Sequence, residues 1–120
     1  MRIVVVGGTG LIGARVVRDL SELGHEAVAA ARATGVDAYT AEGLEEVLDG
    51  TEIVVDVSNS PYTRPDEAID YFRTSTLNLL TFGRNAGVRH HVALSVVGTD
   101  RLARAAGGYF AAKVQQERLV

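Results

Sequence analysis

The sequence contains no cysteine among its 120 residues. This absence excludes disulfide bonds, thiolate nucleophiles and thiolate metal sites, and it fits a reducing compartment such as the cytoplasm. An excess of positive charge is also missing, because the formal net charge is −3 and the isoelectric point is about 5.5. Without a basic stripe, neither nucleic acid nor an anionic membrane is expected as a partner.

Long hydrophobic runs are missing as well. The first apolar run stops at Gly7, which is too early for a signal peptide or a membrane span. Repeats, low-complexity tracts and interdomain linkers are absent from the sequence. With 47% apolar residues, residues 1–120 are expected to form one domain that buries about two-thirds of its unfolded surface.

What the sequence does contain is a β-branched run that leads into four glycines and then into a helical pattern. Residues 3–6 lack polar alternation, which is typical of a parallel strand buried on both faces. Gly7 or Gly8 would permit a tight turn, Gly10 would let a pyrophosphate approach the backbone, and Gly13 would let the helix pack closely on the strand. The segment therefore predicts a nucleotide-phosphate site.

The backbone of the following helix belongs to the same hypothesis. The free N–H groups near Leu11 and Ile12 would face the phosphates, with the positive end of the helix dipole behind them. A glycine-rich turn without a ligand is the alternative. The strand before the glycines and the helix after them favour the nucleotide.

Strand and helix patterns alternate along the chain, which predicts an α/β fold with a doubly wound, Rossmann-like parallel sheet. Val16, Val17, Leu20 and Leu23 would form the buried stripe of the first helix, and Gly24 would end it. Strands are expected at residues 3–6, 26–31, 53–57 and 91–97, with a short one at 36–39, and helices at 11–23, 44–48, 66–86 and 109–120.

Two irregularities stand out in this pattern. Only residues 32–35 separate the second strand from residues 36–39, whereas a parallel crossover needs a dozen or more. Residues 36–39 therefore cannot be a long parallel strand, and they are expected to cross the edge of the sheet. The fold also looks truncated after its fifth strand and the following helix, which predicts exposed apolar surface and possible homo-oligomers.

Several motifs together resemble the short-chain dehydrogenase/reductase superfamily, and most closely its atypical NmrA-like NAD(P)-binding branch. They are the glycines at positions 7, 10 and 13, the stretch Asn78-Leu79-Leu80 ahead of residues 86–89, Ser95 in a strand, and Tyr109-x-x-x-Lys113. The resemblance spans nearly the whole chain. It implies that the chain carries the cofactor half of such a protein and little of its substrate half.

Tyr109 and Lys113 would share one face of a helix, so that the ammonium group favours the phenolate and also reaches ribose hydroxyls. The resemblance makes this pair the acid/base device, with Ser95 bonding the reacting carbonyl oxygen. Simple packing of Tyr109 and solvation of Lys113 is the alternative. Lys113 is the only lysine beside eleven arginines, which favours a specific role. Phe72 stands where many members of the superfamily have a catalytic Asn.

Arg32 follows the second strand, where an arginine suits the 2′-phosphate of NADP and an acidic residue suits NAD. No carboxylate is expected to compete with Arg32 for the cofactor at this strand end, because Glu26 begins the strand and Asp37 lies beyond its end. The sequence thus favours NADP, with NAD possible and an ordinary solvated Arg32 as the alternative. Ser58 and Asn59 follow the central strand, where they would either contact the cofactor or cap the turn.

No metal site is expected, because His90 and His91 are adjacent in a strand and point to opposite faces. The leading hypothesis is an NAD(P)-dependent oxidoreductase that transfers hydride to or from a carbonyl or quinone-type small molecule. A non-catalytic NADP(H)-sensing NmrA-like module is the alternative. A structural fragment that binds no nucleotide is a third hypothesis.

Overall fold

The computed structural model describes residues 1–59 and 64–93. Strand β1 (Arg2–Val6) lies inside the sheet, and its residues 3–6 are all buried. It pairs in parallel with β2 (Glu26–Ala30) on one side and with β3 (Ile53–Asp56) on the other. The unbroken β-branched run therefore does form a strand that is buried on both faces, as predicted.

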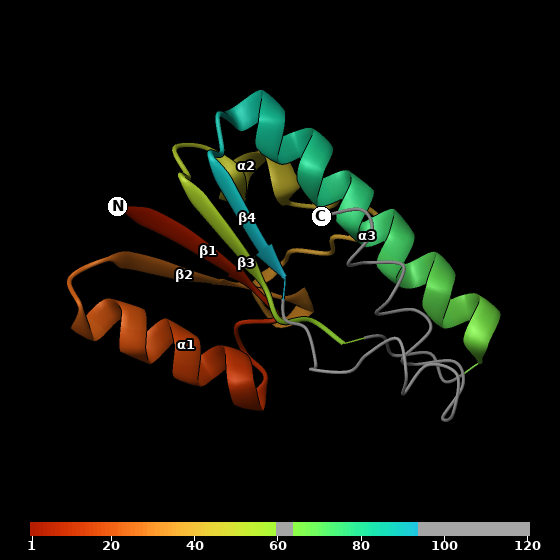
Figure 1. The fold of residues 1–120 in the computed structure, drawn as a ribbon, viewed down its shortest axis with the longest axis horizontal. Coiled ribbons are helices and arrows are strands. Elements are labelled where there is room, and N and C mark those ends of the chain that lie inside the picture. The colour runs from red at the N-terminus through yellow and green to blue at the C-terminus, as the bar shows by residue number, and fades with distance from the viewer. Residues whose placement is uncertain (60–63, 94–120) are drawn as a thin grey trace.

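The sheet of the described residues has the order β2-β1-β3-β4, with β4 spanning His90–Ala93, and each neighbouring pair is parallel. Helix α1 (Leu11–Glu22) covers one face, and α2 (Leu44–Leu48) and α3 (Pro65–Ala86) cover the other (Figure 1). The predicted doubly wound α/β sheet is confirmed. Because the strands are parallel, their carboxyl ends meet at one edge, which is where ligands bind in open sheets of this kind.

Helix α1 (Leu11–Glu22) begins directly after the glycines. It ends in the expected left-handed glycine, since Gly24 has a φ of +91°. The N–H groups of Gly24 and His25 donate to the carbonyls of Ser21 and Leu20 at 3.0 and 3.1 Å. This pair of bonds is a Schellman motif, which satisfies carbonyls that the last turn would otherwise leave without partners.

The expected buried stripe of α1 is only partly right. Val16, Val17 and Leu20 are half-buried against the sheet, whereas Leu23 is 75% exposed. Leu23 is the C-cap, where the chain already leaves the helix to enter the turn at Gly24. Its side chain therefore does not lie over the sheet.

The connection from β2 to β3 contains no strand, so the short strand expected at residues 36–39 is wrong. A 3-10 turn (Arg32–Thr34) follows β2, and Asp37 forms only an isolated antiparallel bridge with Glu42. The amide of Asn78 in α3 donates to the carbonyls of Ala38 and Tyr39 at 2.8 and 3.1 Å. These carbonyls bond to a side chain rather than to a neighbouring strand, which explains why the segment stays irregular.

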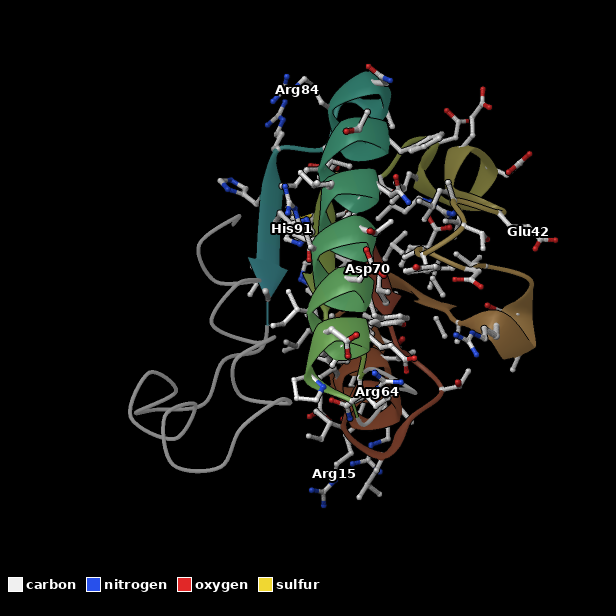
Figure 2. All side chains as sticks on the ribbon, turned by 90° about the vertical axis from the view of Figure 1, so that its right-hand side faces the viewer. Arg15, Glu42, Arg64, Asp70, Arg84 and His91 are labelled. Atoms are coloured by element: carbon white, nitrogen blue, oxygen red, sulfur yellow. The ribbon has the colours of Figure 1, made fainter. Side chains whose placement is uncertain are left out.

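Helix α3 (Pro65–Ala86) has proline at its first turn and ends at Gly87, whose φ is +86°, as predicted. Figure 2 shows Arg64 and Arg84 at its two ends and His91 of β4 beside it. Together with α2 (Leu44–Leu48), α3 covers the main core of the sheet. The fully buried members of this core are Val4, Ala30, Leu44, Leu48 and Val54, with Leu79 at 1% exposure.

The predicted strand at residues 91–97 is described as far as Ala93. Residues 94–97 of that prediction, and the helix expected at 109–120, lie outside the described residues. Among the helices of residues 1–59 and 64–93, none is both long enough and apolar enough to cross a bilayer.

Candidate functional site

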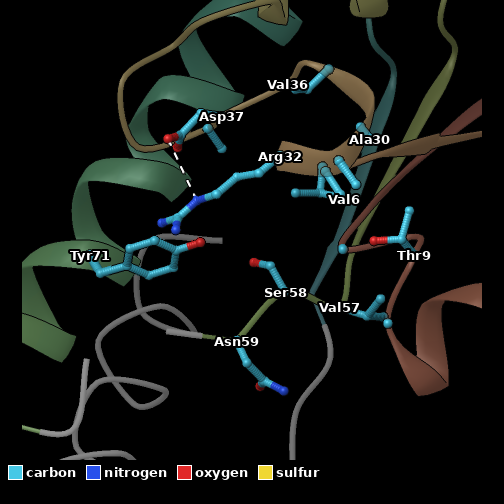
Figure 3. Close-up of a pocket in the computed structure, with 15 residues that line it drawn as sticks. Val6, Thr9, Ala30, Arg32, Val36, Asp37, Val57, Ser58, Asn59 and Tyr71 are labelled. Atoms are coloured by element: carbon cyan, nitrogen blue, oxygen red, sulfur yellow. Dashed lines mark ion pairs between the residues drawn. The ribbon is translucent and has the colours of Figure 1, made fainter. Parts of the chain in front are cut away.

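A cleft of about 380 Å³ opens at the carboxyl ends of β1, β2 and β3 (Figure 3). Its position is where the fold predicts a ligand, and its volume is typical of small-molecule sites. The glycine loop forms one wall, and the segment after β2 forms another. The residues that line the cleft are Val6, Gly7, Thr9, Gly10, Ala30, Ala31, Arg32, Ala33, Val36, Asp37, Ala38, Val57, Ser58, Asn59 and Tyr71.

Three glycines of the loop are required by the fold itself. A Cβ atom on Gly8 would lie 2.7 Å from the Cα of Ala29 in β2. Gly7 has a φ of +82°, and a Cβ atom built on it would lie 2.9 Å from the Cα of Ser58. A Cβ atom on Gly13 would lie only 2.0 Å from the carbonyl oxygen of Gly7. A side chain at any of these three positions would therefore push the loop away from β2 or β3, or lift α1 off the loop.

Gly10 is different, because no contact within residues 1–59 and 64–93 requires a glycine there. Its backbone is extended, with φ −75° and ψ 178°, and a Cβ atom would come no closer than 3.4 Å to the described residues. Gly10 is exposed and lines the cleft. The space above it is therefore open to a ligand.

The first turn of α1 continues this wall. The side chains of Leu11 and Ile12 are exposed, at 89% and 51%. Their backbone N–H groups, with that of Gly13, precede the first intrahelical hydrogen bond, which Ala14 donates to Gly10 at 2.9 Å. Among the described residues no side chain caps this helix end, so its N–H groups are oriented for an anion.

Arg32 lies on the opposite wall of the cleft, but it is not alone there. Its Nε atom lies 3.7 Å from the Oδ2 atom of Asp37. The expectation that no carboxylate would compete at this strand end is therefore wrong. The turn after β2 reverses the chain within a few residues, and this brings Asp37 back beside Arg32.

Ser58 follows β3, and its hydroxyl donates to the Oδ1 atom of the buried Asp56 at 2.6 Å. The backbone N–H of Ser58 donates to the same oxygen at 3.0 Å. Ser58 thus takes part in its own turn and lines the cleft as well, and its contact with a cofactor stays a prediction. Asn59 is exposed and also lines the cleft.

Tyr71 is a residue of the cleft that the sequence did not single out. Its hydroxyl points from α3 into the cleft (Figure 3). Burial, and next the carboxylate of Asp56, raise the pKa of this hydroxyl above its usual value of 10.0, so it stays a neutral donor at physiological pH. Stacking on Tyr39, with ring centroids 5.6 Å apart, holds the ring in place.

Neither Tyr71 nor Asp37 could be found from a local motif. Tyr71 continues the apolar pattern of its helix, and next to Phe72 it resembles any core aromatic residue. Phe72, at the position where the resemblance implies a catalytic Asn, is fully buried and meets Tyr71 edge-on at 5.5 Å. The only signal for Asp37 was the unusually short connection after β2.

The residues expected to be catalytic, Ser95, Tyr109 and Lys113, lie outside the described residues. Of the two histidines in β4, His90 is exposed and His91 is half-buried. Burial lowers the pKa of His91, and its Nε2 atom has no hydrogen-bond partner among the described residues.

Several solved structures are similar to this chain over nearly its whole length. A UDP-galactose 4-epimerase is 25% identical with a TM-score of 0.76, and MoeE5 in complex with UDP-glucose and NAD is 25% identical with a TM-score of 0.78. Each alignment covers 99% of this chain but only 50% and 48% of those structures. The fold is also shared by a short-chain dehydrogenase/reductase superfamily protein from Agrobacterium tumefaciens with bound NAD, which is 21% identical with a TM-score of 0.80. That alignment covers 99% of this chain and 44% of the other.

One curated relative is similar over a shorter stretch. The 4-hydroxy-tetrahydrodipicolinate reductase of Natronomonas pharaonis is 37% identical over 68 residues, which are 53% of this chain and 28% of the reductase. This chain thus spans about half of the similar structures and less of the reductase. The NAD dependent epimerase/dehydratase family model matches residues 3–120, which is nearly the whole sequence. On this match, the chain belongs to the NAD-dependent epimerase/dehydratase family.

Proposed function

We propose that the cleft binds a nicotinamide adenine dinucleotide, with its pyrophosphate over Gly10 and the first turn of α1. The observation that carries this proposal is the contrast within the glycine loop. Gly7 and Gly13 are required by backbone contacts, whereas Gly10 has no such requirement and faces the cleft. A ligand that approaches the backbone at Gly10 accounts for a glycine that no described contact requires.

The two walls of the cleft offer complementary chemistry for the rest of the dinucleotide. The N–H groups of Leu11, Ile12 and Gly13 would bind phosphate oxygens, as helix N-termini commonly do. Arg32, at the end of β2, would lie beside the adenosine ribose, where it can pair with a 2′-phosphate. Ser58 and Asn59, at the end of β3, would line the path toward the nicotinamide.

We further propose an oxidoreductase that transfers hydride to or from a carbonyl or quinone-type small molecule. In this proposal the nicotinamide supplies or accepts the hydride when it is bound. Tyr109 exchanges the proton, Lys113 lowers the pKa of that phenol and bonds the ribose, and Ser95 orients the substrate oxygen. Family membership and the Tyr109-x-x-x-Lys113 spacing support these roles.

A specific observation favours a second candidate, an NmrA-like module that senses NADP(H) without turnover. Phe72, where the resemblance implies a catalytic Asn, is fully buried and carries no polar atom that could take part in proton transfer. A protein that only binds the dinucleotide needs the glycine loop but not that asparagine.

Calorimetric titration of the chain with NAD⁺, NADP⁺ and adenosine tests the binding proposal. If the pyrophosphate is held by the helix N-terminus, adenosine should bind at least about tenfold more weakly than either dinucleotide, because charge-assisted hydrogen bonds are lost. Adenosine binding as tightly as NAD⁺, or no binding of either dinucleotide, would contradict the proposed site.

Two substitutions separate the enzyme from the sensor. Tyr109→Phe should leave dinucleotide affinity unchanged and abolish turnover of a carbonyl panel followed by nicotinamide absorbance. Lys113→Ala should weaken both affinity and turnover, because Lys113 is proposed to bond the ribose. If the unmodified protein binds the dinucleotide but turns over none of the panel, the sensing module is favoured.

A further inference from the structure

The guanidinium of Arg32 and the carboxylate of Asp37 form an ion pair on the wall of the cleft (Figure 3). Their closest atoms, Nε and Oδ2, are 3.7 Å apart. The side chain of Arg32 is 60% exposed, and that of Asp37 is 23% exposed. The pair is therefore accessible to a ligand, and the long side chain of Arg32 has more rotamers available to it than that of Asp37.

Asp37 is held in place by contacts that do not involve Arg32. Its Oδ1 atom accepts the backbone N–H of Tyr39 at 2.9 Å, and its own N–H donates to the carbonyl of Glu42 at 2.9 Å. Asn78 of α3 secures the same turn through its bonds to residues 38 and 39. The carboxylate is thus a fixed negative charge beside a cation that can rotate.

We propose that Asp37 is a positioning residue that determines cofactor selectivity through Arg32. This inference rests on the proposed function, since it assumes that a dinucleotide occupies the cleft. A 2′-phosphate placed at Arg32 would also lie close to the carboxylate of Asp37, and the repulsion offsets part of the attraction. The 2′-hydroxyl of NAD carries no charge and does not experience this repulsion.

As a consequence, the site prefers NADP less strongly than it would if Arg32 had no carboxylate beside it. Asp37 draws Arg32 toward itself, so NADP must share the guanidinium with a second anion. NAD meets a pair whose charges already cancel. The fixed carboxylate therefore allows the same site to bind both dinucleotides.

The experiment measures the affinities of the full chain for NAD⁺ and NADP⁺ by calorimetry before and after Asp37→Asn. Asparagine has nearly the same shape and keeps an oxygen for the Tyr39 N–H, while it removes the charge. NADP⁺ affinity should rise about threefold to fivefold, the range for a partly exposed ion pair, and NAD⁺ affinity should stay within about twofold. Glu42→Gln removes a charge from the same turn outside the cleft, so it is the matched control and should change neither affinity.

A double-substitution cycle shows whether Asp37 acts through Arg32. In the Arg32→Ala background, Asp37→Asn should raise NADP⁺ affinity less than it does in the presence of Arg32. An unchanged affinity ratio in Asp37→Asn overturns the inference and leaves the proposed function intact. A selective loss of NAD⁺ affinity also overturns it, because Asp37 would then contact the ribose directly. If the unmodified chain binds neither dinucleotide, the proposed function itself fails.

Discussion

At the scale of single residues, the glycines of the loop differ in whether backbone contacts require them. Gly7 combines a positive φ with a close approach to Ser58, and Gly13 approaches the carbonyl of Gly7. These two roles follow from strand-turn-helix geometry and could be predicted from the sequence. The role of Gly10 differs, because no contact among the described residues requires a glycine there, and we propose that a ligand does.

Arg32→Ala tests the opposite wall of the cleft. If Arg32 pairs with a 2′-phosphate, the substitution should weaken NADP⁺ binding by about 1.5 to 3 kcal/mol, the range for a hydrogen bond to a charged group. NAD⁺ binding should change little, because NAD has no phosphate at that position. Titration of the variant with both dinucleotides decides the matter, and equal losses for the two would exclude this role of Arg32.

The site could be predicted only where a local motif marks it. The glycines, Arg32 and the residues after β3 stand at strand ends, so their convergence follows from the parallel sheet. Asp37 and Tyr71 reach the cleft through a turn and through a helix face that no short motif defines. Their place depends on how tightly the chain reverses after β2, which is a property of tertiary packing.

At the scale of elements, the connection between β2 and β3 departs most from the expected pattern. Its shortness was clear from the sequence, and this correctly excluded a long parallel strand. The sequence could not show that the amide of Asn78, about forty positions away, would bond the carbonyls of residues 38 and 39. A distant side chain thus decided the local structure, whereas the helices with clear end signals matched their predicted ranges closely.

Asn78→Ala tests this role of the helix. The substitution leaves two carbonyls of the turn without their donor, so the free energy of unfolding should fall by about 1 to 3 kcal/mol. Asn85→Ala, at an exposed position on the same helix, is the control and should have little effect. Urea unfolding followed by circular dichroism measures both. Equal stability of the two variants would show that the turn does not depend on Asn78.

His91 gives β4 a dependence on acid. Burial lowers the pKa of its imidazole below the usual 6.5, so the folded state keeps it neutral while the unfolded state takes up a proton. Its contribution to stability is complete above pH 6.5 and is lost as the pH falls through the lowered pKa. His91→Gln should therefore make the free energy of unfolding less sensitive to pH below 6.5.

The matched control for this prediction is His90→Gln, which replaces the exposed neighbour on the same strand. It should leave the acid branch of the profile as in the unmodified chain. Urea midpoints measured across this pH range compare the three proteins. If His91→Gln and the unmodified chain lose stability in parallel, the buried imidazole does not cause the acid sensitivity.

At the scale of the whole molecule, the parallel sheet brings residues that are far apart in sequence to one edge. Gly10 precedes β2, Arg32 follows it, and Ser58 follows β3, yet all three line one cleft. The alternation of strands and helices was sufficient to predict this layered architecture. Binding at this edge should stabilise the entire domain, by about 2.7 kcal/mol when the dinucleotide is present at one hundred times its dissociation constant.

The central claim is that a dinucleotide lies against the backbone at Gly10. Calorimetric titration with NAD⁺ of Gly10→Val and Gly24→Ala tests it most directly, with the free energy of unfolding of each variant measured alongside. Position 10 has an ordinary φ and open space, so Gly10→Val should lose no more than about 1 kcal/mol of stability, the cost of valine at a helix N-cap. It should bind NAD⁺ at least about tenfold more weakly, a change of about 1.4 kcal/mol. Gly24→Ala forces a side chain into a φ of +91°, so it should lose about 1 to 2 kcal/mol of stability with unchanged affinity. Unchanged NAD⁺ affinity in a folded Gly10→Val variant would contradict the account.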